Sequence, residues 1–400
     1  MMVRRERYLK QIEPFIDNEL VKVLVGVRRS GKTVLLSQIQ DCLGERGIKP
    51  EQIISLNFES MKNRQYQNAD ALYQYVSQIA ERIDGKVYIF MDEIQEVEGW
   101  QTVVNSFRVD LDCDIYITGS NSKLLSGELA TVFSGRYVQI KVLPFTFAEV
   151  CQLEQEQNRF SSYEASFANY LKYGGFPGRC LLPDEHSVMT YLLDLYDAVM
   201  IRDIVNRHKV KEMAVLKNVL EFMLDNVGNP FSVRKIAGKL VSEGIKIAPS
   251  TLLNYIDYFK EAFVLYNASR YDLKGKELLA STEKYYAVDL GLRNIVKKSE
   301  VVDSSKLYEN AVYLEMKSRG YEIQVGKLDE NEIDFICIRG VEKLYIQVAY
   351  LITETDQERE FGNLEKINDN YPKYVVSGDL MDLSRNGIIH KNIIKFLLEQ

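Results

Sequence analysis

A glycine-rich segment near the amino terminus carries residue types that bind phosphate. Residues 26–33 read GVRRSGKT and match the pattern G-x-x-x-x-G-K-[ST]. Gly26 and Gly31 let the backbone turn its N–H groups inward around an anion, because neither residue has a side chain in the way. Lys32 adds a mobile positive charge, and Thr33 supplies a hydroxyl for Mg²⁺. The segment predicts a binding site for a nucleoside triphosphate, and we expect ATP and Mg²⁺ there.

The stretches on either side of this segment are those that the chemistry requires. An apolar run at 21–25 precedes it and is expected to be a strand, and a helix is expected to begin at Lys32. That helix directs its positive dipole end at the same anion. We expect the backbone of Arg29, Ser30 and Val34 to contribute to the phosphate site, without separate roles for side chains at the variable positions. The strand before and the helix after argue against a chance match in an unrelated loop.

Two adjacent carboxylates follow a second apolar run. Residues 86–91 are almost wholly apolar, which is typical of a parallel strand buried on both faces. Asp92, at the carboxyl end of this strand, is expected to hold Mg²⁺ through water, and Glu93 to activate a water that attacks the γ-phosphate. The alternative is that both carboxylates merely cap the next segment. The pair indicates hydrolysis rather than binding alone.

A polar residue after a third expected strand, at 113–118, is a candidate sensor of the γ-phosphate. Ser120 or Asn121 occupies that position, and we assign the role to Ser120. Arg136 is the candidate arginine finger, since a guanidinium delivers charge to the transferring phosphoryl oxygens in a fixed fork. It is expected to act in cis or from a neighbouring subunit, and the alternative is an ordinary surface salt bridge.

Taken together, these segments resemble those of prokaryotic AAA+-type P-loop ATPases. The segments that carry the resemblance are GVRRSGKT, SLNFES, VYIFMDEIQ, ITGSNSKLL, FSGRY, VLPFTFAEV and YLKYGGFPG. The resemblance implies ATP hydrolysis and a switch that is oligomeric or coupled to a partner protein. It also implies an ATPase core at 1–150, a helical lid at 151–209, a winged-helix region at 210–300 and a degenerate PD-(D/E)XK nuclease-like domain at 301–400.

Length and composition agree with several domains in one chain. Four hundred residues, 46% of them hydrophobic, are too many for one ordinary core and indicate two to three domains. No stretch approaches about eighteen uninterrupted apolar residues, and the basic amino terminus lacks the apolar part of a signal peptide. We therefore expect a cytoplasmic protein that does not bind a membrane. The five cysteines are widely spaced and the three histidines lie far apart, which argues against a disulfide framework and against zinc.

The middle of the chain has the spacing of elements that is typical of a helix-turn-helix. A helix is expected at 231–240 and another at 249–262, followed by short strands at 263–269 and 285–288. In a winged helix, polar residues of the second helix face a major groove of duplex DNA and basic residues between the strands contact phosphates. The net charge of −7 does not favour a nucleic-acid binder. Duplex DNA is therefore one alternative for this region, and a protein contact or an ATPase lid are the others.

The last third of the chain has the element order of a nuclease-like fold. Glu309 lies on an expected helix, and Asp334 leads into an expected strand. Metal-dependent phosphodiester cleavage needs clustered carboxylates to hold Mg²⁺ and a nearby lysine. The final motif reads Gln347-Val348-Ala349, so its lysine is absent and its carboxylate has become an amide. The pattern favours a fold retained for binding or assembly over active cleavage.

The sequence thus predicts an α/β protein with a P-loop NTPase core of the AAA+ type, a helical lid, a winged helix and a C-terminal α/β nuclease-like domain. The predicted function is ATP binding and hydrolysis coupled to conformational change, in a homo-oligomer or with a protein partner, acting on DNA or on that partner. One alternative is a nucleotide-gated DNA-binding or partner-binding switch with little turnover. Another is a Mg²⁺-dependent DNA nuclease.

Overall fold

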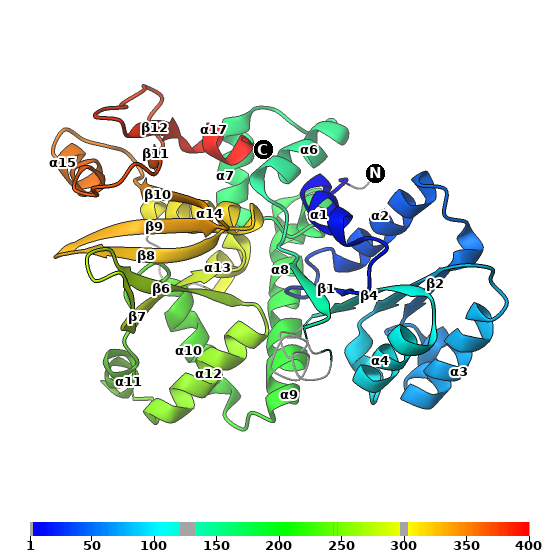
Figure 1. The fold of residues 1–400 in the computed structure, drawn as a ribbon. Helices are drawn as coiled ribbons and strands as arrows, with labels where there is room; N and C mark the ends of the chain where they lie inside the picture. The colour runs from blue at the N-terminus through cyan, green and yellow to red at the C-terminus, as the bar shows by residue number, and fades with distance from the viewer. Residues whose placement is uncertain are drawn as a thin grey trace. The chain divides into compact units, whose positions relative to one another are not determined.

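The protein is described by a computed structural model, which covers residues 3–120, 133, 135–242, 244–245, 247–296 and 303–399 (Figure 1). The chain divides into two compact units. The first unit comprises residues 2–142 with 261–263, and the second comprises residues 143–260 with 264–400. Each unit is built around its own β-sheet.

The first unit contains a parallel sheet with the strand order β2-β3-β4-β1-β5. Its strands are β1 (Val21–Val25), β2 (Ile53–Asn57), β3 (Val87–Asp92), β4 (Cys113–Gly119) and β5 (Tyr137–Lys141). Every position of β1 and of β3 is buried, as expected when helices cover both faces of a parallel sheet. Because all five strands run the same way, their carboxyl ends meet at one edge.

Helices cover both faces of this sheet, with α2 on one face and α3 and α4 on the other (Figure 1). The α-helices are α1 (Glu6–Ile12), α2 (Lys32–Glu45), α3 (Ala69–Ala80) and α4 (Trp100–Asp110), and the 3₁₀ helices are η1 (Glu13–Phe15), η2 (Pro50–Gln52), η3 (Met61–Tyr66) and η4 (Ile94–Glu96). α2 begins at Lys32 because its N-cap residue, Gly31, takes the left-handed conformation with a φ of 96°. Apolar side chains of α1 and α2 share one hydrophobic core with the strands.

The second unit contains a seven-stranded mixed sheet with the order β12-β11-β10-β9-β8-β6-β7. Its strands are β6 (Leu265–Asp272), β7 (Glu277–Ala287), β8 (Glu322–Leu328), β9 (Asn331–Arg339), β10 (Glu342–Val348), β11 (Lys373–Ser377) and β12 (Ile389–Asn392). The pairs β6–β7, β8–β9 and β9–β10 are antiparallel, whereas β6–β8, β10–β11 and β11–β12 are parallel. A buried apolar cluster joins residues of β9, β10 and β11.

The other described helices follow β5 in the chain, and α14 packs against the mixed sheet (Figure 1). They are α6 (Phe147–Glu156), α7 (Tyr163–Tyr173), η6 (Arg179–Leu181), α8 (Glu185–Ala198), the π-helix η7 (Val199–Val205), α9 (Asn206–His208), α10 (Met213–Asp225), α11 (Val233–Ser242), α12 (Pro249–Glu261), α13 (Leu290–Val296), α14 (Ser304–Ser318), α15 (Gln357–Glu360), α16 (Gly362–Glu365) and α17 (Ile393–Leu398). In the described ranges, none of the helices has the length and apolar character needed to cross a membrane.

The mixed sheet joins two regions that the sequence analysis assigned to separate domains. β6 and β7, expected as the strands of a winged-helix hairpin, pair with each other, and β6 also pairs in parallel with β8. The predicted boundary near residue 300 therefore does not separate two sheets. The sequence pattern did not predict the shared sheet, because β7 spans 277–287 and only its last few residues form a clear apolar run. The two preceding helices, α11 and α12, lie close to their expected positions.

Candidate functional site

The carboxyl edge of the parallel sheet gathers polar residues from several strands. Gly26 follows β1, Asn57 ends β2, Asp92 ends β3 and Thr118 lies next to last in β4. Asn57 and Asp92 are register neighbours, and β1 lies directly beside β4. The sheet topology therefore brings the phosphate-binding loop and the paired carboxylates of the sequence analysis to one edge.

The phosphate-binding loop depends on glycine where it leaves β1. Gly26 has a φ of 155°, and a Cβ atom there would lie 2.1 Å from the carbonyl oxygen of Val142, so any larger residue would clash with the backbone. The ammonium of Lys32 lies inside the loop, where it donates to the carbonyl oxygens of Gly26 and Val27 at 3.0 and 3.1 Å. The loop thus places a lysine charge at the amino terminus of α2.

The other predicted phosphate ligands lie in the same turn and at the start of α2. Arg29 has a φ of 66° and an exposed side chain. The N–H of Ser30 donates to the carbonyl oxygen of Val27 at 3.2 Å, so it is used within the turn itself. Val34 lies in the first turn of α2. Arg28, for which the sequence indicated no role, donates to the Glu59 carboxylate at 2.6 Å.

Asp92 is held by donors from three different elements. Its Oδ2 accepts from the Thr33 hydroxyl at 2.9 Å and from the Asn57 amide at 2.8 Å. Its Oδ1 accepts from the Thr118 hydroxyl at 2.5 Å. Burial raises the pKa of Asp92, and the hydroxyl bonds of Thr118 and Thr33 oppose that shift. The two predicted metal ligands, Thr33 and Asp92, are therefore in direct contact.

The side-chain oxygens of Thr33 and Asp92 fit Mg²⁺, which binds oxygen ligands and keeps several of its waters. The Thr33 hydroxyl oxygen and the Asp92 carboxylate oxygen lie 2.9 Å apart. Among the described residues, no group of three or more acidic, histidine or cysteine side chains is placed to hold a metal ion. A hydroxyl and a carboxylate oxygen in contact suit a cation that takes its other ligands from nucleotide phosphates and waters, as is usual for Mg²⁺ in phosphoryl-transfer sites.

Glu93 follows β3 in a conformation that is uncommon for residues other than glycine. It has a φ of 53°, and such residues persist where surrounding contacts fix them. Its N–H donates to the Thr118 hydroxyl at 2.9 Å, and its Oε2 accepts from the Gln95 amide at 2.5 Å. Both the backbone and the carboxylate of Glu93 are thereby oriented at the sheet edge.

Ser120, the predicted sensor, is buried directly after β4 at the same edge. Asn121, the other candidate for that role, lies outside the described residues. The β4 residue that contacts Asp92 and the Glu93 backbone is Thr118, two positions before Ser120. The role of Ser120 stays a prediction, and the hydroxyl that contacts both acidic residues belongs to Thr118.

Arg136, the predicted arginine finger, lies at the opposite edge of the sheet. It precedes β5, and its carbonyl oxygen accepts from the N–H of Val21, the first residue of β1, at 3.1 Å. β1 and β5 are parallel, with Val21 opposite Tyr137. The five residues of β1 span about 16 Å, so Arg136 is too far from its own phosphate-binding loop to touch a nucleotide there. The expected action in cis is not compatible with this geometry.

Asn57, Gln95 and Thr118 were not singled out from the sequence. Asn57 and Thr118 each occupy the carboxyl end of an apolar run, and Gln95 lies two positions after Glu93. Polar residues at the ends of parallel strands converge at one edge, and this is the signal that would have found the first two. Gln95 gives no comparable signal, because its contact with Glu93 depends on the turn into η4.

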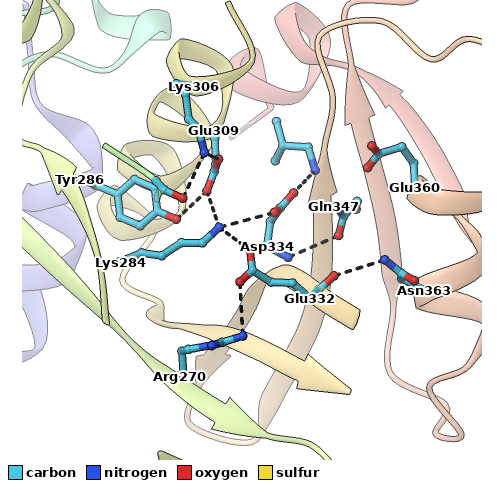
Figure 2. A network of polar contacts seen from close by, with 12 residues as sticks. Arg270, Lys284, Tyr286, Lys306, Glu309, Glu332, Asp334, Gln347, Glu360 and Asn363 are labelled. Atoms are coloured by element: carbon cyan, nitrogen blue, oxygen red, sulfur yellow. Dashed lines mark hydrogen bonds and ion pairs between the residues drawn. The ribbon is translucent and has the colours of Figure 1, made fainter. Parts of the chain in front are cut away.

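A buried ion cluster lies in the second unit, where the sequence indicated nuclease-like carboxylates (Figure 2). The ammonium of Lys284, which is 3% exposed, lies 3.1 Å from Glu309, 2.7 Å from Glu332 and 3.9 Å from Asp334. The Tyr286 hydroxyl also donates to Glu309, at 2.8 Å. The carboxylates thus converge on a lysine from β7.

The last nuclease-like motif of the sequence has no lysine, and the structure pairs its expected carboxylates with a lysine from β7. Arg270 and Lys306 lie at the same cluster, 3.5 Å from Glu332 and 3.4 Å from Glu309. Three cations therefore face three carboxylates. Burial, together with the charge of Glu309, raises the pKa of Asp334 to about 7. The cluster is an internally balanced network of ion pairs.

Two family models match separate parts of the chain. A model described as an AAA domain matches residues 18–151. A model described as a domain of unknown function (DUF8612) matches residues 164–303. The first match contains the phosphate-binding loop and both carboxylates of the site, and the second contains the strands β6 and β7.

Two relatives extend over nearly the whole chain. An uncharacterized protein of Haemophilus influenzae is 40% identical over 399 residues, which cover 100% of this chain and 99% of the relative. An uncharacterized protein of Methanocaldococcus jannaschii is 34% identical over 371 residues, which cover 89% of this chain and 80% of the relative.

A solved structure shares the fold. It is the Walker-type ATPase of Pyrococcus abyssi, with a TM-score of 0.50 and 17% sequence identity, covering 74% of this chain and 96% of that chain. At this identity the likeness concerns the fold alone. The chain belongs to one protein family with the uncharacterized proteins of H. influenzae and M. jannaschii, and its residues 18–151 form an AAA domain with the P-loop ATPase fold.

Proposed function

We propose that the protein binds ATP and hydrolyses it, as an AAA+-type ATPase that couples turnover to a conformational change. The observation that carries this proposal is the contact between Thr33 of the phosphate-binding loop and Asp92, with Glu93 in the next position. A hydroxyl at a helix start and a carboxylate at a strand end, in contact beside a lysine-bearing loop, suit triphosphate chemistry, whereas either one alone would be an ordinary polar residue.

In this proposal the loop backbone and Lys32 bind phosphate oxygens, and Thr33 and Asp92 hold Mg²⁺. When bound, Mg²⁺ neutralises charge that develops on the phosphoryl oxygens. Glu93 accepts a proton from the attacking water as general base. Ser120 is the proposed sensor of the γ-phosphate.

The arginine finger is proposed to act on the nucleotide of a neighbouring copy of the chain. Arg136 is exposed and lies across the sheet from its own phosphate-binding loop. A guanidinium in such a position serves phosphoryl transfer only when a second subunit carries it to the site. A homo-oligomer with nucleotide sites at its interfaces follows from this proposal.

Duplex DNA or a protein partner is the proposed target of the middle region. α11, α12 and the β6–β7 hairpin follow one another in the element order of a winged helix. The net charge of −7 gives no support to nonspecific binding of DNA. A protein partner is therefore the rival for the same surface.

The domain division is also part of the proposal. We assign an ATPase core to residues 1–150 and a helical lid to 151–209. The winged-helix region at 210–300 and the nuclease-like region at 301–400 are assigned as two parts of the chain that share one sheet. The shared sheet supports treating these two parts as one structural unit in this proposal.

For the nuclease-like region we propose a degenerate fold without cleavage. Glu309 on α14 and Asp334 on β9 lie on the elements where the nuclease pattern places carboxylates. Lys284 already pairs with both of them, at 3.1 and 3.9 Å, so a Mg²⁺ ion would have to displace a buried ammonium. A Mg²⁺-dependent DNA nuclease is the least supported of the three functions.

Steady-state phosphate release from ATP tests the proposed function. Wild type, Lys32→Ala and the matched control Lys62→Ala, which removes an exposed lysine of η3, are compared with and without duplex DNA. We expect turnover in wild type and in the control, and its loss in Lys32→Ala. Stimulation of turnover by DNA would support duplex DNA as the target of the middle region. If none of the three proteins hydrolyses ATP and the affinity for DNA depends on ATP, the proposal of an ATPase is wrong. The nucleotide-gated binding switch is then the better description.

A further inference from the structure

Arg5 is a charged residue buried behind the phosphate-binding loop. It is 1% exposed, and it lies in the segment that precedes α1. Its guanidinium Nη1 donates to the carbonyl oxygen of Ser30 at 3.1 Å. Ser30 belongs to the GVRRSGKT loop and is itself fully buried. A cation from outside the motif thus bonds directly to the motif's backbone.

The position of Arg5 is fixed by contacts on both sides. The Gln38 side chain of α2 accepts from the N–H of Arg5 at 3.0 Å and donates to the carbonyl oxygen of Val3 at 2.7 Å. The Arg5 guanidinium carbon also lies 4.5 Å from the centre of the Tyr8 ring, within the range of a cation–π contact. The segment is therefore tied to the same helix that begins at the loop.

The bond to Ser30 has a consequence for the other face of the loop. A trans peptide is planar, so the carbonyl of Ser30 and the N–H of Gly31 point in opposite directions. Arg5 holds that carbonyl, so the Gly31 N–H points away from the Arg5 guanidinium. Backbone N–H groups of this loop are the groups that cradle phosphates in the pattern G-x-x-x-x-G-K-[ST].

We propose that Arg5 is a positioning residue for nucleotide binding, which orients the Ser30–Gly31 peptide so that its N–H faces the triphosphate. The proposal rests on the proposed function, because it needs a nucleotide in the loop. Arginine suits the task better than a neutral donor, since hydrogen bonds from a charged group are stronger than those between neutral groups. Its buried charge also adds positive potential at a site for an anion.

Nucleotide affinity and steady-state kinetics of the full chain test the proposal. Arg5→Met keeps the aliphatic stem of the side chain but removes the guanidinium, and with it both the hydrogen bond to Ser30 and the contact over the Tyr8 ring. We expect the dissociation constants of ATP and of ADP to rise alike, by about tenfold, as the loss of one charge-assisted hydrogen bond predicts. KM for ATP should rise with little change in kcat, because the interaction is made equally in the ground state and in the transition state.

Arg4→Met is the matched control. It removes the neighbouring arginine, which pairs with Glu45 at 3.0 Å on the surface, and we expect unchanged affinity. Affinities are measured at a temperature well below thermal unfolding, so that a loss of stability alone does not lower them. If Arg5→Met does not fold, Arg5→Lys replaces it, and we expect about threefold weaker binding from the lost guanidinium fork.

The outcomes separate the two proposals. Weaker binding in the Arg5 variant with unchanged binding in Arg4→Met supports the positioning role. Equal affinity in a folded Arg5 variant and in wild type overturns that role and leaves the proposed function intact. No ATP binding by wild type, with the same result for Lys32→Ala, overturns both proposals.

Discussion

At the scale of the residue, Thr118 connects the Asp92 carboxylate to the backbone of Glu93, two acidic residues to which we assign different tasks. Its hydroxyl donates to Asp92 and accepts from the backbone N–H of Glu93. One hydroxyl carries both a donor and acceptor lone pairs, so both bonds are satisfied at once. The proposed metal ligand and the proposed general base are therefore positioned by the same side chain.

Gln95 is expected to matter for turnover rather than for binding. Gln95→Met removes the amide that donates to Glu93, and we expect kcat to fall by about tenfold because a general base must be correctly placed to accept a proton. The dissociation constant of ATP should not change. The control is Gln152→Met, which alters an exposed glutamine of α6. A kcat equal to that of wild type would show that Gln95 does not orient the base.

The site could be predicted from the sequence where it is contiguous. The loop with Lys32 and the pair Asp92 and Glu93 are short motifs, each with an apolar strand before it. Asn57 comes from β2 and Thr118 from β4. A single polar residue at the end of a strand is too common to be singled out from the sequence. Both residues are found only when the strand order β2-β3-β4-β1-β5 is known.

At the scale of the element, the mixed sheet of the second unit carries a cluster of charged side chains around the buried ammonium of Lys284. Lys284 comes from β7, Glu332 and Asp334 from β9, and Glu309 from α14 (Figure 2). A buried ion pair is costly to form because its members lose hydration, and it is costlier still to leave half of it unpaired. The cluster therefore links two strands and a helix that lie apart in the sequence.

Lys284→Met is expected to destabilise the protein strongly. The change leaves three acidic side chains without the cation that they share, and breaking a buried pair in this way costs about 3–5 kcal/mol. Free energies of unfolding from urea titrations measure the effect. Lys274→Met is the control, because it breaks the exposed pair with Asp329, and exposed pairs contribute little. Equal stability of the two variants would show that the cluster does not support the sheet.

The pH dependence of stability should report on Asp334. Its pKa is raised to about 7 in the folded protein, whereas an unfolded chain has a value of about 3.9. The folded state binds this proton more tightly, so the stabilisation is complete below the unfolded pKa and is lost as the pH rises through the folded pKa. Between pH 5 and pH 8, wild type should lose more stability than Asp334→Asn.

Urea titrations at both pH values check this, with Asp329→Asn as a control at an exposed aspartate. The control should lose as much stability as wild type between the two pH values. A loss in Asp334→Asn as large as that of wild type would contradict the assigned shift.

The elements themselves were largely predictable, and their pairing was not. Apolar runs ending in Val25, Met91 and Thr118 became strands of a parallel sheet, because buried parallel strands carry a continuous apolar pattern. The partners of β6 and β7 were missed, since pairing between distant strands leaves no local signal. That is why a predicted boundary fell in the middle of a seven-stranded sheet.

At the scale of the whole molecule, the proposal requires more than one copy of the chain. Arg136 cannot reach its own phosphate-binding loop, so an ATPase that uses it needs a second subunit. The family relationship covers nearly the full chain, so the AAA domain and the region with the mixed sheet occur together in the relatives.

Mixing two inactive variants tests the assignment of Arg136 in trans. We expect Arg136→Ala to lose about a thousandfold in turnover, as is usual for an arginine finger, and Lys32→Ala to bind no nucleotide. In a mixed oligomer, the intact Arg136 of one variant serves the intact loop of the other, so turnover should return. Arg108→Ala controls for the loss of a neighbouring arginine. Mixtures that stay inactive although the subunits assemble would contradict a finger in trans.

The central claim is that Glu93 activates water at an ATP bound beside Lys32 and Asp92. Single-turnover hydrolysis of radiolabelled ATP by wild type and by Glu93→Gln, with the dissociation constant of each protein for ATP, tests it most directly. We expect similar affinities and a loss of at least about a hundredfold in the rate of hydrolysis for Glu93→Gln. Hydrolysis by Glu93→Gln at the wild-type rate would contradict it.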